Sequence, residues 1–410
     1  MKLKYYAFLL IFTLICSCDN DDNVEYEFVQ VATPQIMSKT AFRNSVDIVA
    51  SKSIKEAGKI YVYNDYIFIS EKNEGIHIID NSNPKSPHAI KFIEIHGNED
   101  ISVKDNYLYA DSATDLLVFD ISDINSVSLI ERLEDVFVIY DYQIPVEAEA
   151  VEYGDFNYET EIIVGWTLAL EKREIVNTDV FIEFDAALVN AESTKGQGGS
   201  LARFQIVNNY LYTVGSSEMA IFNIQNLASP LLEATQQVGW RIETMFQSEN
   251  YLYLGSTNGM YIYSLENPSE PTYISEFTHW ELCDPVVVDG DYAYLTLRGG
   301  NRCGVEESVL EVIDISDKYN PSLVGMYPLD NPYGLGVKGT SLFVCDDDSG
   351  LKLFDKTNPL ELQLLKTYDN VQSKDVIPLE NTLIIIGNNT LYQYKYVDNG
   401  VELLSAYSLN

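Results

Sequence analysis

The residues that could carry out catalysis are few and scattered. The four histidines, His77, His88, His96 and His279, include no close pair, and five cysteines are too few for a disulfide scaffold. No carboxylate pair stands at a spacing diagnostic of general acid–base chemistry, and neither a glycine-rich phosphate loop nor a metal-ligand signature is present. The acidic run 346–348 lacks the spaced ligands of a calcium loop, so a solvated turn is expected there. The sequence therefore predicts no catalytic residue, no metal site and no cofactor.

A second set of residues suits binding rather than catalysis. Aromatic platforms beside carboxylates and guanidiniums fit sugars or peptides, which present apolar faces edged with hydrogen-bonding groups. The candidate ligand-binding residues are Arg203, Trp240, Arg241, Glu243, His279, Trp280, Asp284 and Tyr333. The two tryptophans could instead pack between structural elements. An enzyme would use Glu243 with Asp284, or His279 as a base.

The composition describes a globular, strongly acidic protein. The chain has 410 residues, of which 46% are hydrophobic and 21% charged, so it can bury a large core. Acidic residues outnumber basic ones 62 to 26, which gives a formal net charge of −36. Such a charge repels phosphate backbones and argues against a nucleic-acid partner.

One short phrase recurs along the chain and predicts the elements that position these residues. An aromatic–apolar–aromatic triplet follows a turn at Tyr107-Leu108-Tyr109, Tyr210-Leu211-Tyr212, Tyr251-Leu252-Tyr253 and Tyr292-Ala293-Tyr294, with looser copies from 66, 341 and 382. The spacings 66 to 107, 210 to 251, 251 to 292 and 341 to 382 are each 41 residues. A fixed period near 41 with four short strands per unit is typical of a β-propeller. We therefore expect an all-β fold with seven blades.

The positions of the strands follow from the fifth copy. Strands are expected at 285–288, 292–297, 310–315 and 323–327. Eight blades are the alternative, because the long gap between the copies at 107 and 210 contains strand-like segments. The segment 46–51 resembles an outermost strand, so we expect it to sit in the sheet that the C-terminal repeat completes, which would suppress exposed edges.

The repeats also resemble a known family. Gly75-Ile76-His77-Ile78-Ile79-Asp80, Leu310-Glu311-Val312-Ile313-Asp314 and Gly350-Leu351-Lys352-Leu353-Phe354-Asp355 are similar to the LVIVD repeat, a propeller unit common in bacterial surface lipoproteins. The resemblance covers about residues 46–410 and implies a fold but no reaction. The third copy departs from the pattern with Asn223 where Asp is usual, and the seventh does so at Lys395.

Two insertions are expected on one face of the ring. In an antiparallel blade, the connection from the outermost strand to the next innermost strand and the loop between the second and third strands emerge at the same end, here called the top face. The insertion 136–200 is a connection of the first kind and 298–306 a loop of the second. Added loops on a rigid scaffold often bind ligands, although surface loops also accept length at little cost.

The cysteines of the expected ring divide into a pair and a single residue. Cys283 and Cys303 are both predicted at the top face of one blade, where an exported compartment would permit a disulfide between them. Cys345, at the end of a strand, has no such neighbour and is expected in the core.

The N-terminus predicts export and lipidation. Lys2 and Lys4 precede an apolar run from Tyr5 to Ile15, which is typical of a signal peptide over residues 1–17. The sequence Ile15-Cys16-Ser17-Cys18 resembles a bacterial lipobox, with Cys18 as the acylated residue. The acidic run that follows resembles the signal for the outer face of the outer membrane in one group of Gram-negative bacteria, or is a simple spacer. Residues 18–45 are expected to form the lipidated N-terminus and tether, and residues 46–410 the propeller.

These features together predict a lipid-anchored protein of the outer membrane, exposed at the cell surface. The expected role is a binding or adhesion scaffold, monomeric, with a glycan or protein ligand at the mouth of the propeller channel. An enzyme acting on extracellular polysaccharide is the alternative, distinguished by turnover of a glycan.

Overall fold

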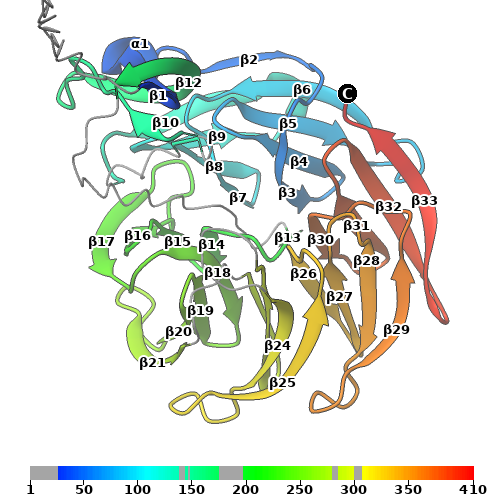
Figure 1. Ribbon diagram of the computed structural model, residues 1–410. Coiled ribbons are helices and arrows are strands. Elements are labelled where there is room, and N and C mark those ends of the chain that lie inside the picture. The colour runs from blue at the N-terminus through cyan, green and yellow to red at the C-terminus, as the bar shows by residue number, and fades with distance from the viewer. Residues whose placement is uncertain (1–25, 138–143, 146–147, 175–196, 279–284, 300–306) are drawn as a thin grey trace, which may run out of the picture.

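The chain is an all-β protein whose sheets stand around a common axis (Figure 1). The computed structural model describes residues 26–137, 144–145, 148–174, 197–278, 285–299 and 307–410. Seven sheets contain the same four-stranded antiparallel meander, and we number these repeat sheets 1 to 7 in chain order. The strands run in order from the innermost to the outermost within each repeat.

The bounds of the strands are as follows. Sheet 1 contains β3 (Ala57–Tyr63), β4 (Tyr66–Glu71), β5 (Gly75–Asp80) and β6 (His88–Glu94). Sheet 2 contains β7 (Ile101–Lys104), β8 (Tyr107–Ser112), β9 (Asp115–Asp120) and β10 (Ser128–Leu133), with a 3-10 turn at Ile124–Ser126. Sheet 3 contains β14 (Phe204–Val207), β15 (Tyr210–Val214), β16 (Glu218–Asn223) and β17 (Leu231–Gln237). Sheet 4 contains β18 (Ile242–Ser248), β19 (Tyr251–Ser256), β20 (Gly259–Ser264) and β21 (Thr272–Thr278).

The remaining repeats follow the same plan. Sheet 5 contains β22 (Val286–Asp289), β23 (Tyr292–Leu297), β24 (Ser308–Asp314) and β25 (Ser322–Leu329). Sheet 6 contains β26 (Leu335–Lys338), β27 (Ser341–Cys345), β28 (Leu351–Asp355) and β29 (Gln363–Tyr368). Sheet 7 contains β30 (Asp375–Pro378), β31 (Thr382–Ile386), β32 (Thr390–Val397) and β33 (Gly400–Ser408). The four strands predicted for the fifth copy agree with sheet 5 to within about two residues at each end.

The tyrosines of the repeated phrase hold each sheet against the next. Tyr109 and Tyr212 are fully buried, and their hydroxyls donate to the backbone carbonyls of Leu227 at 2.9 Å and Pro268 at 2.6 Å in the following repeat. A buried tyrosine needs such a partner for its hydroxyl. The third residue of each triplet is therefore a core residue.

The aspartate of the repeat ends the third strand of sheets 1, 2, 5 and 6 by a local turn. Asp80, Asp314 and Asp355 each accept the backbone N–H of the residue two positions ahead, at 2.8 to 2.9 Å. This hydrogen bond offers the backbone a turn in place of continued sheet pairing. Asn223, which departs from the pattern, makes the same bond to the N–H of Gln225 at 2.9 Å, so the departure preserves the turn.

The structure has eight sheets rather than the expected seven, because two segments outside the repeats form a sheet of their own. In this sheet β1 (Tyr26–Ser38) pairs antiparallel with β12 (Glu161–Glu174), and parallel with the short β11 (Ala150–Val151). We call it the ribbon. The eighth sheet is thus not a degenerate repeat, although the strand-like segment at 161–166 is part of it.

The N-terminal segments also differ from expectation. Residues 26–43, expected within the tether, form β1 and the helix α1 (Lys39–Arg43). The strand β2 (Asp47–Ala50) pairs with β6 of sheet 1 and not with the C-terminal sheet, so that expectation was wrong. Sheet 7 supplies its own outermost strand β33 and leaves no vacancy, and the ring closes through side chains such as Ile377 and Ile384 packed against sheet 1.

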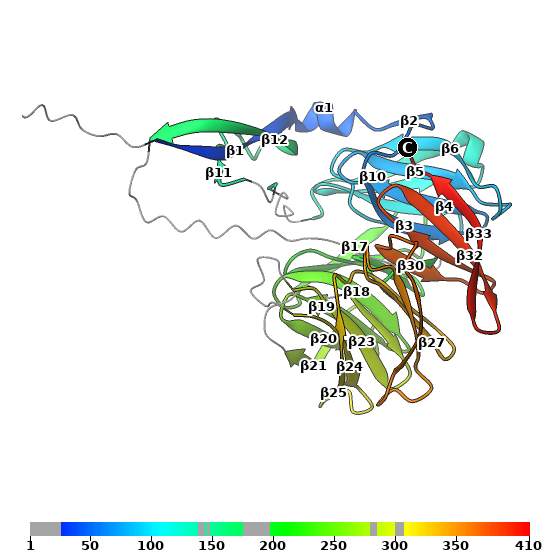
Figure 2. The same cartoon turned by 45° about the vertical axis from the view of Figure 1, so that its right-hand side comes forward.

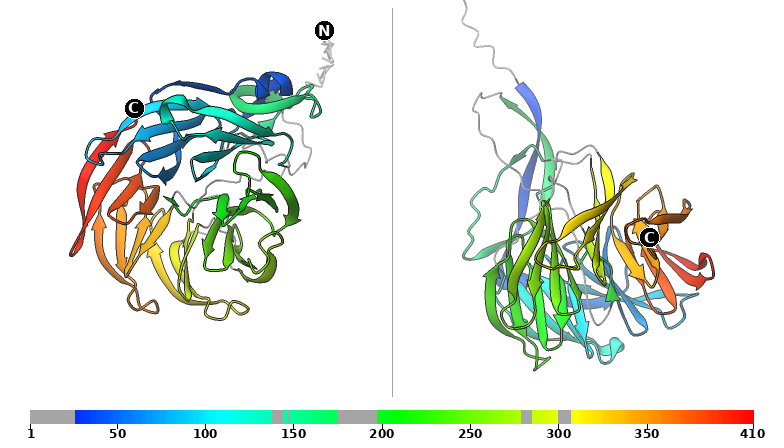
Figure 3. Two further views of the ribbon diagram at one scale, coloured as in Figure 1. Left: turned by 180° about the vertical axis from the view of Figure 1, so that it is seen from behind. Right: turned by 90° about the horizontal axis from the view of Figure 1, so that it is seen from below.

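The ribbon projects beyond the ring, as the views from the side and from below show (Figures 2 and 3). In the part of the chain that the structure describes, no helix has the length and apolar character needed to cross a membrane.

Candidate functional site

The inside of the ring is occupied by the chain itself. Residues 197–202, the end of the insertion, begin with β13 (Gln197–Gly198), which adds to the inner edge of β3 in sheet 1. The hydroxyl of Ser200 then accepts the N–H of Leu335 in sheet 6 at 2.8 Å, and the carbonyl of Ala202 accepts the N–H of Met245 in sheet 4 at 2.5 Å. Contacts with three separate sheets within six residues mean that this segment crosses the ring (Figure 1).

Asp375 at the start of β30 closes against this segment. A Cβ added to Gly199 would lie 1.8 Å from Oδ2 of Asp375, and one added to Gly334 would lie 2.3 Å from Oδ1, so only glycine fits on both sides of this carboxyl group. Burial raises the pKa of Asp375 to about 7, although the backbone N–H groups of Val376 and Ser200 oppose the shift. The carboxyl group is 1% exposed and fixes the crossing segment rather than facing solvent.

A second buried group joins sheets 1, 2 and 3 on the opposite side of the crossing segment. Asp100 Oδ2 accepts the backbone N–H groups of Arg203 at 2.7 Å and Phe204 at 3.0 Å, and lies 3.2 Å from Nζ of Lys59. The guanidinium of Arg203 pairs with Glu99 at 2.9 Å. Arg203 was predicted to contact a ligand, but it is 5% exposed and is engaged inside the ring.

Asp111 lies beneath this group and is also fully enclosed. Its Oδ1 accepts the backbone N–H groups of Glu99 at 2.8 Å and Asp100 at 3.0 Å and the side-chain amide of Asn98 at 2.7 Å. Burial, helped by the charge of Glu99, raises the pKa of Asp111 to about 7. A carboxyl group with this pKa suits proton transfer, but one without access to solvent acts as a structural acceptor.

Glu243 is one of the two carboxylates that the enzyme alternative would use. Its side chain belongs to β18 and is 2% exposed. A polysaccharide at the mouth of the ring would not reach this carboxylate without rearrangement of the inner strands. The geometry therefore gives the catalytic alternative no accessible acid or base at this position.

The top face carries an accessible cluster around Tyr333. The ring of Tyr333 lies beneath two cations: the guanidinium carbon of Arg298 is 4.2 Å and Nζ of Lys374 is 3.6 Å from its centroid. The backbone is held by neighbouring strands, since the N–H of Tyr333 donates to Cys345 at 2.8 Å and its carbonyl accepts the hydroxyl of Thr296 at 2.6 Å. Cation–π contacts of this kind position positive charge at a fixed place.

Trp240 gives the same face an exposed aromatic surface. Its side chain is 75% exposed, the largest exposure among the described large hydrophobic residues. The neighbouring Arg241 is also exposed and adopts a positive φ of 51°, a conformation that is uncommon outside glycine and asparagine. An exposed tryptophan presented by a tight turn contributes nothing to a core, so the alternative that Trp240 packs between sheets does not hold.

Several predicted site residues lie outside the described residues. These are His279, Trp280, Asp284, the proposed disulfide pair Cys283 and Cys303, and the proposed lipidation site Cys18. Cys345 is a free, fully buried thiol whose pKa is raised by burial, as the sequence predicted for a core residue.

The acidic turn 346–348 is a hairpin turn whose first two carboxylates accept from the protein. Asp346 accepts the N–H groups of Asp330 and Asn331 and pairs with Lys352, while Asp347 pairs with Lys374 at 2.9 Å. Among the described residues no group of three or more His, Cys, Asp or Glu side chains could hold a metal ion.

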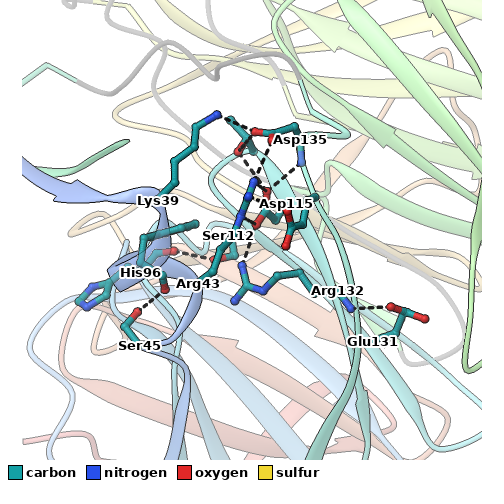
Figure 4. A network of polar contacts seen from close by, with 12 residues as sticks. Lys39, Arg43, Ser45, His96, Ser112, Asp115, Glu131, Arg132 and Asp135 are labelled. Carbon is teal, nitrogen blue, oxygen red and sulfur yellow. Dashed lines mark hydrogen bonds and ion pairs between the residues drawn. The ribbon is translucent and has the colours of Figure 1, made fainter. Parts of the chain in front are cut away.

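An ion-pair network fixes the ribbon to the top face of sheet 2 (Figure 4). Arg43 of α1 pairs with Asp115 at 2.9 Å, Asp135 at 2.9 Å and Glu134 at 2.6 Å, and Arg132 also pairs with Asp115 at 2.8 Å. Although burial alone would raise it, the hydrogen bonds from Arg43, Arg132 and the backbone of Asp135 hold the pKa of Asp115 below its ordinary value. The network therefore orients the base of the ribbon.

The sequence did not identify Arg298, Lys59 and Asp111 as candidate site residues. Arg298 opens the 298–306 loop, and loop surplus was the only signal that pointed to it. Its position over Tyr333 depends on the packing of neighbouring sheets, which a repeat period does not specify.

A family model for the LVIVD repeat matches residues 55–92, 98–135, 247–278 and 283–328. The chain therefore contains LVIVD repeats, and the matched segments include the meanders of sheets 1, 2, 4 and 5. No curated protein sequence matches the chain.

Several solved structures share the fold at low identity. A computationally designed protein, Ika8, has a TM-score of 0.52 and 10% identity over 88% of this chain and 89% of its own. A protein from Lactobacillus plantarum has a TM-score of 0.51 and 11% identity over 80% and 88%. A functionally unknown protein from Desulfotomaculum acetoxidans has a TM-score of 0.51 and 9% identity over 85% and 95%. At such identities the likeness is one of fold alone.

Proposed function

We propose that this LVIVD-repeat protein is a surface lipoprotein whose propeller-like ring is a binding or adhesion scaffold. In this proposal Cys18 carries the lipid anchor, the protein lies in the outer membrane facing outward, and Cys283 and Cys303 form a disulfide. The ligand is a surface glycan or protein, held on the top face. The repeat fold supports a scaffold role, and the two carboxyl groups whose pKa is raised to about 7, those of Asp111 and Asp375, are both buried.

The observation that carries the proposal is the contrast between the closed ring and its decorated top face. Residues 197–202 fill the inside of the ring, so a ligand site deep in the channel is not supported. The exposed Trp240 and the cluster of Arg298, Tyr333 and Lys374 remain on the top face. In a chain of net charge −36, Arg298 fixed over the ring of Tyr333 favours a ligand that carries negative groups, whereas Lys374 is already paired with Asp347 at 2.9 Å.

A binding array tests this proposal. The chain beginning at residue 24 is applied to glycans and proteins, and the best ligand is then measured with Trp240→Ala and with Tyr333→Ala. Loss of a central aromatic contact typically weakens binding by about 1 to 3 kcal/mol, or roughly tenfold or more. Both variants should keep the melting temperature of the wild type to within a few degrees.

Tyr319→Ala is the matched control. Tyr319 is 69% exposed, but it lies in the turn between the third and fourth strands of sheet 5, on the face opposite to Trp240. Unchanged binding by the Tyr319 variant and weakened binding by the Trp240 variant would support the top face. Equal effects would place the site elsewhere, and turnover of a glycan by the wild type would replace the proposal with the enzyme alternative.

A further inference from the structure

The ribbon has a docked end and a free end. Its two long strands pair from Ser38 with Glu161, beside α1, to Tyr26 with Glu174, at the end furthest from the ring (Figure 2). The docked end is held by Arg43 and its acidic partners. The free end is where the chain enters from the N-terminus.

One face of the free half is apolar and exposed. Residues that pair directly across two antiparallel strands point to the same face. Phe28 pairs with Lys172, Leu170 with Gln30, and Leu168 with Ala32, so all of these share one face. Phe28 is 66% exposed, Leu170 is 61% exposed and Leu168 is 37% exposed. Three large apolar side chains grouped on a projecting element indicate an interaction surface.

The opposite face of the same residues is more polar. It carries the pairs Glu27 with Arg173 and Val29 with Glu171, and Arg173 is held in ion pairs with Glu152 at 2.6 Å and Glu171 at 3.1 Å. The ribbon is therefore two-sided along its free half. A two-sided element of this kind suits a boundary between water and an apolar phase.

The number of residues between Cys18 and the ribbon indicates that this apolar phase is the membrane. Tyr26 is eight residues after Cys18, and an extended chain spans at most about 3.6 Å per residue, so the free end stays within roughly 30 Å of the acylated residue. Phe28, Leu168 and Leu170 lie in the half of the ribbon nearest to the anchor, and the strands of the docked half expose one further large apolar side chain, Ile36, which is 39% exposed. Acyl chains on Cys18 would thus hold this face at a lipid surface.

We propose that the face formed by Phe28, Leu168 and Leu170 rests on the lipid surface into which Cys18 is anchored. This inference rests on the lipid anchor of the proposed function. The acyl chains supply the attachment, and the ribbon fixes how the ring is oriented above the membrane.

Tryptophan quenching in vesicles tests the contact. Full-length lipidated protein is reconstituted into phosphatidylcholine vesicles with or without bromine on the acyl chains, as the wild type and as two variants, Leu170→Trp and Ala169→Trp. These neighbouring positions are both exposed but point to opposite faces of β12. After subtraction of the wild-type emission, the tryptophan at 170 should lose emission in brominated vesicles and shift to the blue, and the tryptophan at 169 should do neither.

Palmitate labelling separates this inference from the anchor on which it rests. Labelled protein with quenching at 170 but not at 169 supports the lipid-facing ribbon. Labelled protein with equal quenching at both positions, or with none, overturns the lipid-facing ribbon and leaves the anchor intact. A dimer in which the tryptophan at 170 is shielded from water but not quenched would do the same. Absence of label on the wild type overturns the anchor and the inference together.

Discussion

Replacing Gly199 by alanine tests whether the end of the insertion fills the ring. The added Cβ would lie 1.8 Å from Oδ2 and 2.1 Å from Cγ of Asp375. Asp375 is almost fully buried, and its Oδ1 accepts the N–H of Val376 at 2.9 Å, so the carboxyl group cannot move aside without losing that bond. Overpacking in a core costs about 1 to 3 kcal/mol. We expect Gly199→Ala to lower the free energy of unfolding by about 2 kcal/mol or more.

A double-mutant cycle assigns the loss to this contact. Asp375→Ala removes the atoms that the new methyl group meets, and by itself costs about 1 to 3 kcal/mol because hydrogen bonds are lost. In the background of Asp375→Ala, Gly199→Ala should cost less than about 0.5 kcal/mol, which gives a coupling energy of about 1.5 kcal/mol or more.

Urea unfolding followed by circular dichroism and tryptophan fluorescence measures these energies. Gly165→Ala is the control, because its Cβ would meet only the end of the flexible Gln35 side chain, at 2.9 Å. This variant should stay within about 1 kcal/mol of the wild type. If Gly199→Ala is as stable as the control, or costs as much with alanine at 375 as with aspartate, the segment does not cross the ring against Asp375.

Three further predictions concern titration, the ribbon and the thiols. Because the pKa of Asp375 is raised to about 7, the folded state holds a proton that the unfolded chain has released; stability should fall by about 1.4 kcal/mol per pH unit from about pH 4 towards 7, and urea titrations of Asp375→Asn should show a flatter profile. Arg43→Met should cost about 1 to 3 kcal/mol and speed proteolysis of the ribbon, whereas Lys39→Met, which breaks a more exposed pair, should cost less than about 1 kcal/mol; equal effects would contradict the role given to Asp115. Non-reducing peptide maps should join Cys283 to Cys303, and Cys345 should react with thiol reagents only after unfolding; a bridge to Cys345 would refute the pairing.

The repeat architecture could be predicted because its determinants are local. The aromatic triplet, the turn aspartate and the strand alternation all lie within one 41-residue unit, and the turn aspartate makes the same hydrogen bond in sheets 1, 2, 5 and 6. Even Asn223, a departure in sequence, forms the expected turn. Short-range chemistry of this kind can be recognised without knowledge of the neighbouring sheets.

The ribbon and the pairing of β2 could not be predicted, because the strands that pair in them lie far apart in the sequence. The side chain of Gln35 in β1 bonds to Thr167 in β12, 132 residues later, and no turn or period links these segments. The segment 46–51 has the pattern of an outermost strand, and it does form one. Both sheet 1 and sheet 7, however, have an outer edge with which it could pair. β2 joins the outer edge of sheet 1, whose meander is as complete as that of sheet 7, and the alternation within 46–51 does not reveal which edge it takes.

The candidate ligand-binding residues stay a prediction, and the structure differs from it in the exposure of two of them. Arg203 and Glu243 lie at the start of innermost strands, where they are 5% and 2% exposed. The structure also fills the space that these strands surround, because the insertion returns through the ring before β14 begins.

The insertion is part of both the ribbon and the ring. A single excursion from sheet 2 builds half of the ribbon, then crosses the ring and enters sheet 3. Since Lys39 and Arg43 pair with Asp135 and Asp115 of sheet 2, the docked end of the ribbon is fixed to the ring. A contact at the free end of the ribbon would thus set the direction in which Trp240 and the Tyr333 cluster face. In the proposed function, the periodic sheets supply rigidity, the connections between them carry the binding residues, and the ribbon sets the direction in which these residues face.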